Sequence, residues 1–390
     1  MGTKFWGYRR PNGDVGCRNH LLILSGTIYA NSVCERVANT ITGAVPITHH
    51  LGRCQTKSDL RQTFWTLVGM GQNPNVGAVV VIDHFREEGC TSEEIAHEIA
   101  KTGKPVEIVN IREANGAIEA TAQATRKAMY LMREISKQRR EEADISELLF
   151  GLNCGTSDTT SGLSSNVALG ACSDRIYREG GRSILAEFPE LMGAEDWLTA
   201  RCVTPEVAQK FLDYIKQYEE RILATGEDIR GSQPTGDNIV GGISTIEEKS
   251  LGGAKKGGSQ PIQDVLWILE KPKKDPGLYL MYTPGHGSES ITAIAAAGSQ
   301  LLVFSTGGGH TINHPLMPTI KITGNINSWN RMSDTVDLDL SGILAGKVSI
   351  EEAGDMIFNE VVEVLNGKLT KCEILKENTG FAIHRIGLSI

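Results

Sequence analysis

The chain has 390 residues, a length that accommodates two or three domains of ordinary size. Its 39 lysines and arginines against 47 aspartates and glutamates give a net charge of −8, which argues against binding to nucleic acid or to an anionic membrane. No apolar run reaches the roughly 18–20 residues of a membrane span, and the first residues lack the apolar stretch of a signal peptide. The eight cysteines include no CxxC pair, so we expect reduced thiols and a cytoplasmic protein.

The first part of the chain alternates strand patterns with helix patterns. Strands are predicted at residues 20–30, 43–48, 77–82 and 105–111, and helices at residues 31–41, 58–71, from 92 onward and 116–139. Thr91 and Glu94 have the spacing of a capping box at the start of the third helix. This alternation indicates a parallel sheet covered by helices on both faces. We therefore expect a Rossmann-like or flavodoxin-like α/β domain over residues 1–140.

A charged segment at residues 136–147 separates this domain from the rest of the chain. Residues 141–390 mix strand and helix patterns with glycine-rich loops, which predicts a second, mixed α/β domain that carries the active-site loops. Within it, residues 226–262 show no clear periodicity, so a long functional loop is expected there. The mixed charges at residues 241–258, Lys249 among them, are typical of a solvated face when taken alone.

Two polar loops follow predicted strands of the first domain. His50 and Cys54 lie in the loop at residues 48–56, and Cys90 ends the loop at residues 82–90. If these strands are neighbours, the loops meet at one edge of the sheet, where imidazole, carboxylate and thiolate groups suit Fe²⁺ or Zn²⁺. The alternative, ordinary polar loops with packed thiols, carries about equal weight.

Two glycine-rich turns in the second domain are candidate substrate sites. The turn after residue 151 offers six hydroxyl or carboxylate side chains before a helix, where unpaired N–H groups receive an anion; simple N-capping is the alternative. The segment at residues 304–315 has three consecutive glycines, which indicates close approach of the backbone to a ligand, or else a solvent loop. The candidate substrate-binding residues here are Asn153, Cys154, Gly155, Ser157, Asp158, Ser161, Thr306, Gly307 and Gly308.

Seven collinear motifs resemble the altronate/galactarate dehydratase family. They are GYRRPNGDVGCRNHLLIL, NPNVGAVVVI, GLNCGTSD, SILAEFPELMGAE, GGISTIEEKSLG, FSTGGGH and PTIKITGN. The resemblance implies a lyase that depends on Fe²⁺ or a similar divalent ion such as Mn²⁺ and converts a 2-hydroxy acid to a 2-keto acid by β-elimination. The reaction requires stabilisation of a dianion, a base at C2 and an acid at the leaving group. We assign His310, Lys249 and His50 to catalysis, and His50, Cys54 and Cys90 to the metal.

The sequence departs from the family pattern at its start and in the predicted pocket. Family members commonly begin with a small SAF-type domain, whereas this sequence begins at GYRRP, which predicts a large subunit with a separate small SAF-domain partner in a homo- or hetero-oligomer. FSTGGGH stands where sugar-acid dehydratases tend to read FTTGRGS, and Arg53 is inserted beside Cys54. Backbone N–H groups at Gly307–Gly309, together with His310 and the cations Arg53, Lys249 and Lys321, suit a sulfonate.

Among named substrates, (2R)-3-sulfolactate therefore ranks first, with pyruvate and sulfite as products. A sugar-acid dehydratase is the alternative within the family, because the same loops suit a second carboxylate. A non-catalytic small-molecule-binding module is the alternative from a different class.

Overall fold

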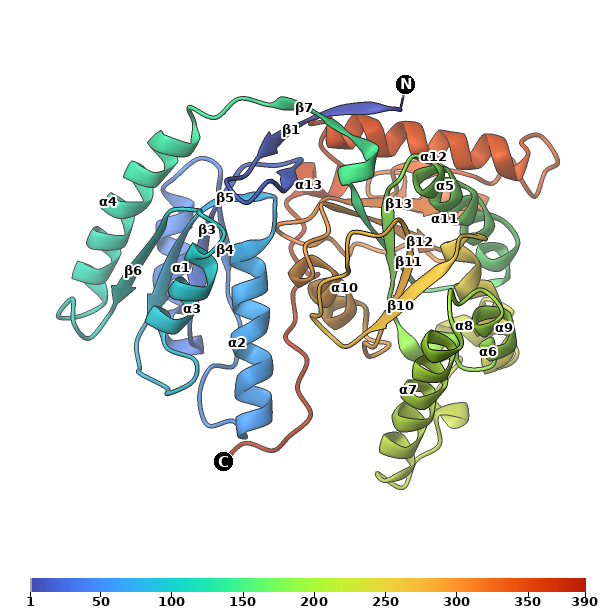
Figure 1. The fold of residues 1–390 in the computed structure, drawn as a ribbon, viewed down its shortest axis with the longest axis horizontal. Helices are drawn as coiled ribbons and strands as arrows, with labels where there is room; N and C mark the ends of the chain where they lie inside the picture. Colours follow the sequence, from blue (N-terminus) through green and yellow to red (C-terminus); the bar gives the residue numbers. More distant parts are fainter. Residues whose placement is uncertain (1) are drawn as a thin grey trace.

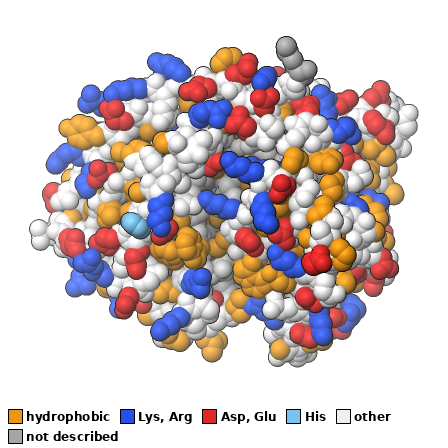
Figure 2. Space-filling view, in the orientation of Figure 1, with side chains coloured by type: hydrophobic (Ala, Val, Ile, Leu, Met, Phe, Trp, Pro, Cys, Tyr) orange, Lys and Arg blue, Asp and Glu red, His pale blue; other side chains and the backbone are white. Residues whose placement is uncertain are grey.

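The computed structural model describes residues 2–390 as two α/β halves side by side (Figure 1). One half has a four-stranded sheet and the other a seven-stranded sheet, and helices α2 (Lys57–Gln72) and α10 (Gly287–Ala296) pack against each other between them. Charges of both signs are interspersed over the face in Figure 2. None of the helices within residues 2–390 combines the length and the apolar character that crossing a bilayer requires.

The four-stranded half has parallel strands in the order β4-β3-β5-β6, the flavodoxin-like pattern in which the first strand lies between the second and the third. Its elements are β3 (His20–Ser25), η1 (Ile28–Ala30), α1 (Asn31–Asn39), β4 (Ala44–Ile47), α2 (Lys57–Gln72), β5 (Val76–Asp83), α3 (Ser92–Ala100), β6 (Val106–Asn110) and α4 (Ala117–Ile135). Each predicted strand and helix is present, and the capping box of Thr91 and Glu94 is confirmed. The α/β class is confirmed.

The seven-stranded half has an entirely parallel sheet in the order β10-β11-β9-β8-β12-β13-β14. Its strands are β8 (Leu149–Gly155), β9 (Arg182–Leu185), β10 (Ile262–Leu266), β11 (Gly277–Met281), β12 (Leu301–Thr306), β13 (Thr319–Thr323) and β14 (Leu338–Asp339). From β8 the chain moves first to β9 on one side and later to β12 on the other. The crevice at the carboxyl ends of β8 and β12 is therefore the position where open α/β sheets bind ligands.

Helices cover both faces of this sheet. They are a π-helical turn η3 (Ser161–Ser165), α5 (Asn166–Arg178), η4 (Phe188–Leu191), α6 (Glu195–Thr199), α7 (Pro205–Leu223), α10 (Gly287–Ala296), α11 (Ile326–Met332), α12 (Ile350–Leu365) and α13 (Lys371–Leu375). Strand β8 shows how the faces divide: the Asn153 side chain donates to Ser290 of α10, whereas the next residue, Cys154, faces Lys256 on the other side. Successive residues of a strand point to opposite faces, so α10 and the Cys154 environment lie on opposite sides of the sheet.

A small antiparallel sheet joins the start of the chain to the segment between the two halves. Strand β1 (Lys4–Arg9) pairs with β2 (Val15–Gly16) and with β7 (Glu141–Asp144), which precedes η2 (Ile145–Glu147). The division into residues 1–140 and 141–390 stays a prediction, with β1 hydrogen-bonded to the beginning of the second part.

Residues 226–262 are not the structureless loop that the missing periodicity predicted. They contain η5 (Ile229–Gly231), α8 (Gly236–Val240), α9 (Ile246–Ala254) and η6 (Lys255–Gly257) before β10 begins. Thr235 and Asn238 form a capping box for α8, and Thr245 accepts a hydrogen bond from the backbone N–H of Glu248 at the start of α9. Helices of one or two turns are too short to display an apolar repeat, although their caps are visible in the sequence.

Two buried asparagines of one family-like motif, NPNVGAVVVI, connect the halves. The Asn75 amide donates to the carbonyls of Gln300 and Leu316 at 2.7 and 2.9 Å, and its Oδ1 accepts from the N–H of Cys17. Asn73 donates to the carbonyls of Ala295 and Ser299. Buried amides with all partners satisfied fix one geometry, so these motif residues orient the two halves.

His314 makes stability depend on pH. It is 1% exposed, its Nδ1 accepts the Leu316 N–H, and burial, with a smaller effect of His20, lowers the pKa of His314 to about 3. The unfolded chain, in which the pKa of His314 is near 6.5, binds a proton more readily than the folded chain does. The stability of the folded state is therefore greatest above pH 6.5 and decreases as the pH falls toward 3. We expect the free energy of unfolding to drop by about 2 kcal/mol between pH 7 and 5 from this residue alone.

Urea unfolding at both pH values measures this drop. His314→Asn retains a hydrogen-bond acceptor and does not titrate, so the drop in its free energy of unfolding between pH 7 and 5 should be smaller by about 2 kcal/mol. His97→Asn, at an exposed histidine, should show the same drop as the unaltered chain. An unchanged pH dependence in His314→Asn would contradict the assignment.

Candidate functional site

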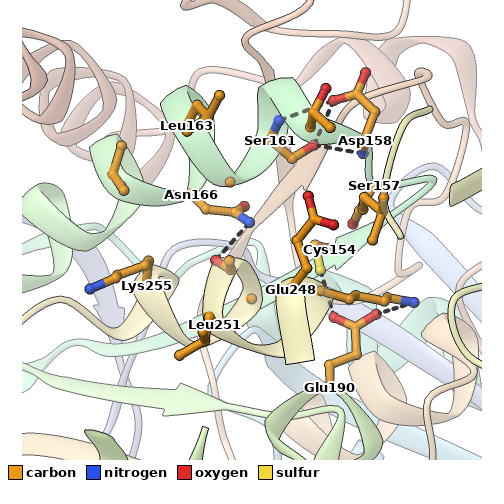
Figure 3. Close-up of a pocket in the computed structure, with 17 residues that line it drawn as sticks. Cys154, Ser157, Asp158, Ser161, Leu163, Asn166, Glu190, Glu248, Leu251 and Lys255 are labelled. Atoms are coloured by element: carbon orange, nitrogen blue, oxygen red, sulfur yellow. Dashed lines mark hydrogen bonds and ion pairs between the residues drawn. The ribbon is translucent and has the colours of Figure 1, made fainter. Parts of the chain in front are cut away.

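A cavity of about 300 Å³ lies at the carboxyl end of β8, between the η3–α5 segment and α9 (Figure 3). Polar and charged side chains gather in it from segments far apart in the sequence. Its polar lining comprises Cys154, Ser157, Asp158, Thr159, Ser161, Asn166, Glu190, Glu248, Lys249 and Lys255. Four apolar side chains, Leu163, Val167, Ile243 and Leu251, complete the wall. Such a cavity, with convergent polar groups in an apolar frame, is typical of a small-molecule site.

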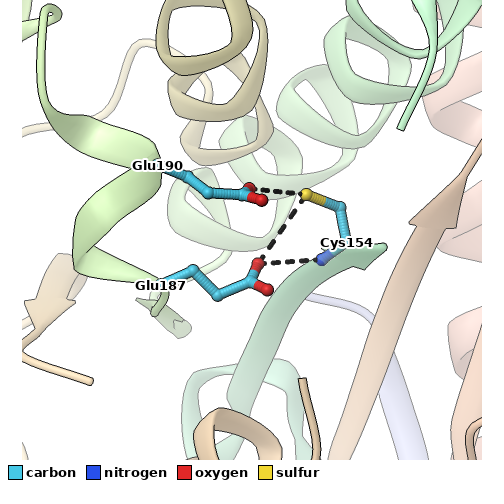
Figure 4. Close-up of side chains that lie close together, drawn as sticks. All are labelled: Cys154, Glu187 and Glu190. Atoms are coloured by element: carbon cyan, nitrogen blue, oxygen red, sulfur yellow. Dashed lines mark hydrogen bonds between the residues drawn. The ribbon is translucent and has the colours of Figure 1, made fainter. Parts of the chain in front are cut away.

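Cys154 and Glu190 of the cavity wall lie close to the Glu187 side chain (Figure 4). The Cys154 Sγ lies 2.9 Å from Glu190 Oε2 and 3.7 Å from Glu187 Oε2, and the backbone N–H of Cys154 donates to Glu187 at 3.1 Å. All three residues are buried, with at most 6% exposure. Glu187 has a left-handed backbone with φ of 68°, which costs energy in a residue other than glycine and occurs mainly at functional positions.

Two buried lysines balance these acidic groups. The Lys256 ammonium lies 2.6 Å from Cys154 Sγ and within 3.7 Å of both glutamates. The Lys249 ammonium is 3.0 Å from Glu190 and donates to Asn238 Oδ1 at 2.9 Å. Lys256 is 1% exposed and Lys249 8%, so each charge depends on its partners rather than on water.

The pKa shifts follow from burial and from this charge pattern. Burial, followed by the nearby negative charge of Glu190, raises the pKa of Glu187 to about 8. Burial also acts to raise the pKa of Glu190, but Lys249 and Lys256 outweigh it and the pKa falls below its usual value. For Lys256, burial acts to lower the pKa, but Cys154 and the two glutamates raise it. The cluster therefore holds at least one carboxylate and two ammonium groups in a buried environment at neutral pH.

This cluster could hold a metal ion. Within residues 2–390, Cys154, Glu187 and Glu190 are the one group of three or more His, Cys, Asp or Glu residues whose ligand atoms all lie within 4.8 Å of one another. A thiolate with two carboxylates suits a first-row divalent ion, and the Lys256 ammonium among these atoms shows that the position favours a cation. The donor set thus fits a divalent metal at the position that the Lys256 ammonium occupies in the structure.

The turn after β8 is stabilised mainly by capping within the chain. The Asp158 carboxylate accepts from Thr160, from the backbone and hydroxyl of Ser161, and from the Asn325 amide. The backbone N–H groups of Asp158, Thr159 and Ser161 all have acceptors in the protein. An anion here must therefore bind to side chains that line the cavity, Ser157 and Lys249 among them, rather than to these N–H groups.

The three glycines after β12, Gly307–Gly309, pack closely against other residues of the chain. A Cβ on Gly307 would lie 2.3 Å from Asp158 Cγ, and one on Gly308 would lie 2.5 Å from Thr156 Cγ2. The N–H groups of Gly307 and Gly308 donate to the Thr156 carbonyl, and that of Gly309 donates to Thr306. The glycines therefore allow the two switch-point loops to touch, and their N–H groups are not free for a sulfonate.

The other predicted residues of this half lie outside the cavity. His310 is half-buried against the Phe304 ring, with Nδ1 accepting from Ile312. A Cβ added to Gly155 would lie 3.4 Å from the His310 ring, so this glycine is next to His310. Lys321 is fully buried and donates to the Ile312 carbonyl at 2.7 Å. The structure thus brings Cys154, Ser157, Asp158, Ser161 and Lys249 together, and it places Asn153, Gly155, Thr306, Gly307, Gly308, His310 and Lys321 elsewhere.

The residues predicted to bind metal in the four-stranded half do not form a compact donor group. His50 and Cys54 are exposed on the loop after β4, whereas Cys90 is fully buried, and they do not meet the ligand spacing found at Cys154. The neighbouring Arg53 places its guanidinium 3.9 Å above the Phe85 ring. A metal role for His50, Cys54 and Cys90 stays a prediction.

Three residues of the cluster were absent from the residues proposed from sequence. Glu187 and Glu190 lie in SILAEFPELMGAE, directly after a strand and three positions apart, a spacing that marks a possible pair. Lys256 lies in GGAKKGGSQ, which contains lysines but has no recognised spacing. Lys249, expected on a solvated face when taken alone, is instead buried against Glu190 because α9 packs over η4.

Comparison with known proteins gives matches along nearly the whole chain. The family model described as D-galactarate/altronate dehydratase, C-terminal, matches residues 145–389, and the one described as D-galactarate dehydratase/altronate hydrolase, second domain, matches residues 7–136. The (2R)-sulfolactate sulfo-lyase subunit beta of Chromohalobacter salexigens is 39% identical, over 96% of this chain and 95% of that protein. The altronate dehydratase of Escherichia coli is 32% identical, over 98% of this chain and 78% of that protein. The galactarate dehydratase (L-threo-forming) of Escherichia coli is 29% identical, over 94% of this chain and 73% of that protein.

Proposed function

Because the chain belongs to the D-galactarate/altronate dehydratase family, we propose that it is a metal-dependent lyase that performs β-elimination on a 2-hydroxy acid. The lyase class follows from the relatives, which are named as a sulfo-lyase and as dehydratases, and the prediction of an enzyme is thereby confirmed. The observation that carries the site is the buried cluster of Cys154, Glu187 and Glu190 with Lys249 and Lys256 beside a 300 Å³ cavity.

The proposed reaction breaks two bonds of the substrate and forms one double bond. A base takes the proton from C2, the bond from C3 to its substituent breaks, and the substituent leaves with the electron pair. The resulting enol tautomerises to the 2-keto acid. Negative charge develops on the substrate carboxylate as C2 loses its proton, and the buried ammonium of Lys249 at the cavity wall is suited to stabilise it.

We assign Cys154, Glu187 and Glu190 as the residues that would hold a divalent ion, with Fe²⁺ first and Mn²⁺ as the alternative. When bound, the ion would supply Lewis acidity for the substrate carboxylate and hydroxyl. The buried setting excludes water and strengthens each interaction with charge. His310 and His50 keep their proposed roles in proton transfer only if the substrate or the partner chain reaches them, because neither lines the cavity.

Among substrates we rank (2R)-3-sulfolactate first. The ranking rests on the sulfo-lyase subunit beta, which this chain matches at higher identity and greater coverage than it matches the sugar-acid dehydratases. In the cavity, Lys249 and Lys255 are the cations available for a sulfonate or carboxylate. Altronate or galactarate remains the second candidate, supported by the dehydratase relatives and by the hydroxyl groups of Ser157, Thr159 and Ser161 in the cavity wall.

We propose further that the active enzyme contains a second, smaller subunit that supplies the SAF-type domain. The support is the name of the sulfo-lyase relative, a subunit beta, of which this chain spans 95%. We expect co-expression with a small SAF-domain chain to yield a stable complex by size-exclusion chromatography, and full activity of the 390-residue chain alone would contradict the proposal.

One assay separates the two substrate classes. The complex, prepared anaerobically with Fe²⁺, is incubated with racemic 3-sulfolactate and separately with altronate and galactarate, and sulfite and 2-keto acid are measured. Equimolar sulfite and pyruvate from at most half of the racemate is the expected result. A 2-keto-3-deoxy acid from a sugar acid without sulfite from sulfolactate would replace the first candidate by the second.

A further inference from the structure

A second group of metal-ligating side chains lies at the start of α10, on the opposite face of the seven-stranded sheet from Cys154. His286 and Glu289 are three positions apart where the chain enters α10, and His384 reaches them from the last segment of the chain. Glu289 Oε2 lies 3.7 Å from His286 Nδ1 and 3.5 Å from His384 Nδ1. The proposed reaction uses none of these residues.

The position of His384 is fixed by contacts on both sides. On one side, Ser288 donates to the Thr379 carbonyl, and Thr292 accepts from the Ala382 N–H. On the other, the buried Asp59 carboxylate of α2 accepts from the N–H groups of Ile386 and Gly387 at 3.0 and 2.7 Å. The segment runs between the two halves as this pattern requires (Figure 1). His384 is therefore held against α10 rather than lying on a free end.

One atom of this group, His384 Nδ1, has no hydrogen-bond partner within residues 2–390. This atom is buried and faces Glu289. The side chains of Glu289 and His384 are 22% and 20% exposed, whereas His286 is 66% exposed and can rotate. Ligand atoms at about 2.1 Å from a tetrahedral metal lie roughly 3.4 Å apart, and the two nitrogen–oxygen distances, 3.7 and 3.5 Å, are close to that spacing.

We propose that His286, Glu289 and His384 form a second divalent-metal site, separate from the Cys154 cluster. Two imidazoles and one carboxylate suit Fe²⁺, Mn²⁺, Co²⁺ or Zn²⁺ and leave positions open for water or an anionic ligand. His384 also lines a cavity of about 230 Å³ with Arg221 and Arg385, where an anion beside the metal would find guanidinium groups. The three donor atoms do not all lie within 4.8 Å of one another in the structure, so the proposed site requires rotation of the exposed His286 ring toward His384.

Cobalt substitution tests this site independently of the proposed function. The metal-free full chain is loaded anaerobically with Co²⁺, bound cobalt is counted after dialysis, and the absorption spectrum is recorded. A thiolate-to-cobalt band reports the Cys154 cluster alone, because His286, Glu289 and His384 contain no sulfur. We expect Glu289→Gln and His384→Gln to lose about one equivalent of Co²⁺ and to keep that band. Cys154→Ser should lose the band and keep the other equivalent.

Two further variants keep the test decisive. His286→Gln changes an exposed side chain and should also weaken cobalt binding at this site, so loss of binding does not depend on a variant that folds poorly. His97→Gln, an exposed histidine of α3, is the matched control and should bind as the unaltered chain does. Equal cobalt content in the unaltered chain, His286→Gln and Glu289→Gln would overturn the proposal and leave only an ion-paired contact. Absence of the thiolate band in every sample would count against the Cys154 assignment alone.

Discussion

Replacing Cys154 by serine is expected to remove the metal from the Cys154 cluster and to reduce kcat/KM by at least about 10³-fold. The thiolate is the soft donor of the proposed set, and Glu187 and Glu190 alone offer only two carboxylates. Serine retains the size of the side chain and a hydroxyl for Glu190, so the fold should persist. Iron content per chain and steady-state kinetics of the purified complex measure the two effects.

Cys202→Ser is the matched control for this experiment. Cys202 is partly buried against the hydrophobic core, its sulfur lies 3.7 Å from the Leu198 carbonyl, and it does not line the cavity. We expect its iron content and rate to equal those of the unaltered enzyme. If Cys154→Ser retains both its iron and its rate, the cluster is structural and the metal lies elsewhere.

Replacing Lys256 by methionine is expected to destabilise the fold by about 3–5 kcal/mol. The ammonium is 1% exposed and contacts Cys154, Glu187 and Glu190, so its removal leaves buried negative charge with Lys249 as the remaining partner. Methionine fills a similar volume, which limits the contribution of a cavity to the loss. Urea unfolding at pH 7 measures the free energy.

A double variant separates the charge effect from packing. Glu190→Gln removes the carboxylate charge that Lys256 balances at pH 7, so Lys256→Met combined with Glu190→Gln should be less destabilised than the sum of the two single variants. Strict additivity would show that the side-chain packing of Lys256, rather than its charge, stabilises the protein. Lys255→Met, at a neighbouring lysine above the Trp197 ring, is the control and should cost much less.

The sequence by itself determined most of the four-stranded half. Short, continuous apolar runs such as residues 77–82 are typical of buried parallel strands, and the helical spacing of apolar residues in the segments between them predicts helices. Thr91 and Glu94 set the start of α3 through contacts three residues apart, so no tertiary information was needed. The glycine-rich turn after residue 151 likewise indicated Cys154 and Asp158, and both residues line the cavity.

Only the tertiary structure decided which of these residues act together. Lys256 is 102 positions from Cys154, and the two meet because α9 and η6 pack over η4 and β8. Glu187 and Glu190 become partners of Cys154 only when β8 and β9 are adjacent in the sheet. Alternation along β8 places Asn153 and Cys154 on opposite faces, although they are neighbours in the sequence.

The glycines after β12 show the same limit. From the sequence, Gly307 and Gly308 indicated close approach of the backbone to a ligand. In the structure they approach the turn at Thr156 and Asp158 instead. His384 meets Glu289 only because Asp59 of the other half holds the segment that follows. Contacts of this kind depend on long-range packing and on the order of strands in the sheet. Local propensity and spacing carry neither, so the sequence determined the elements and the fold determined the sites.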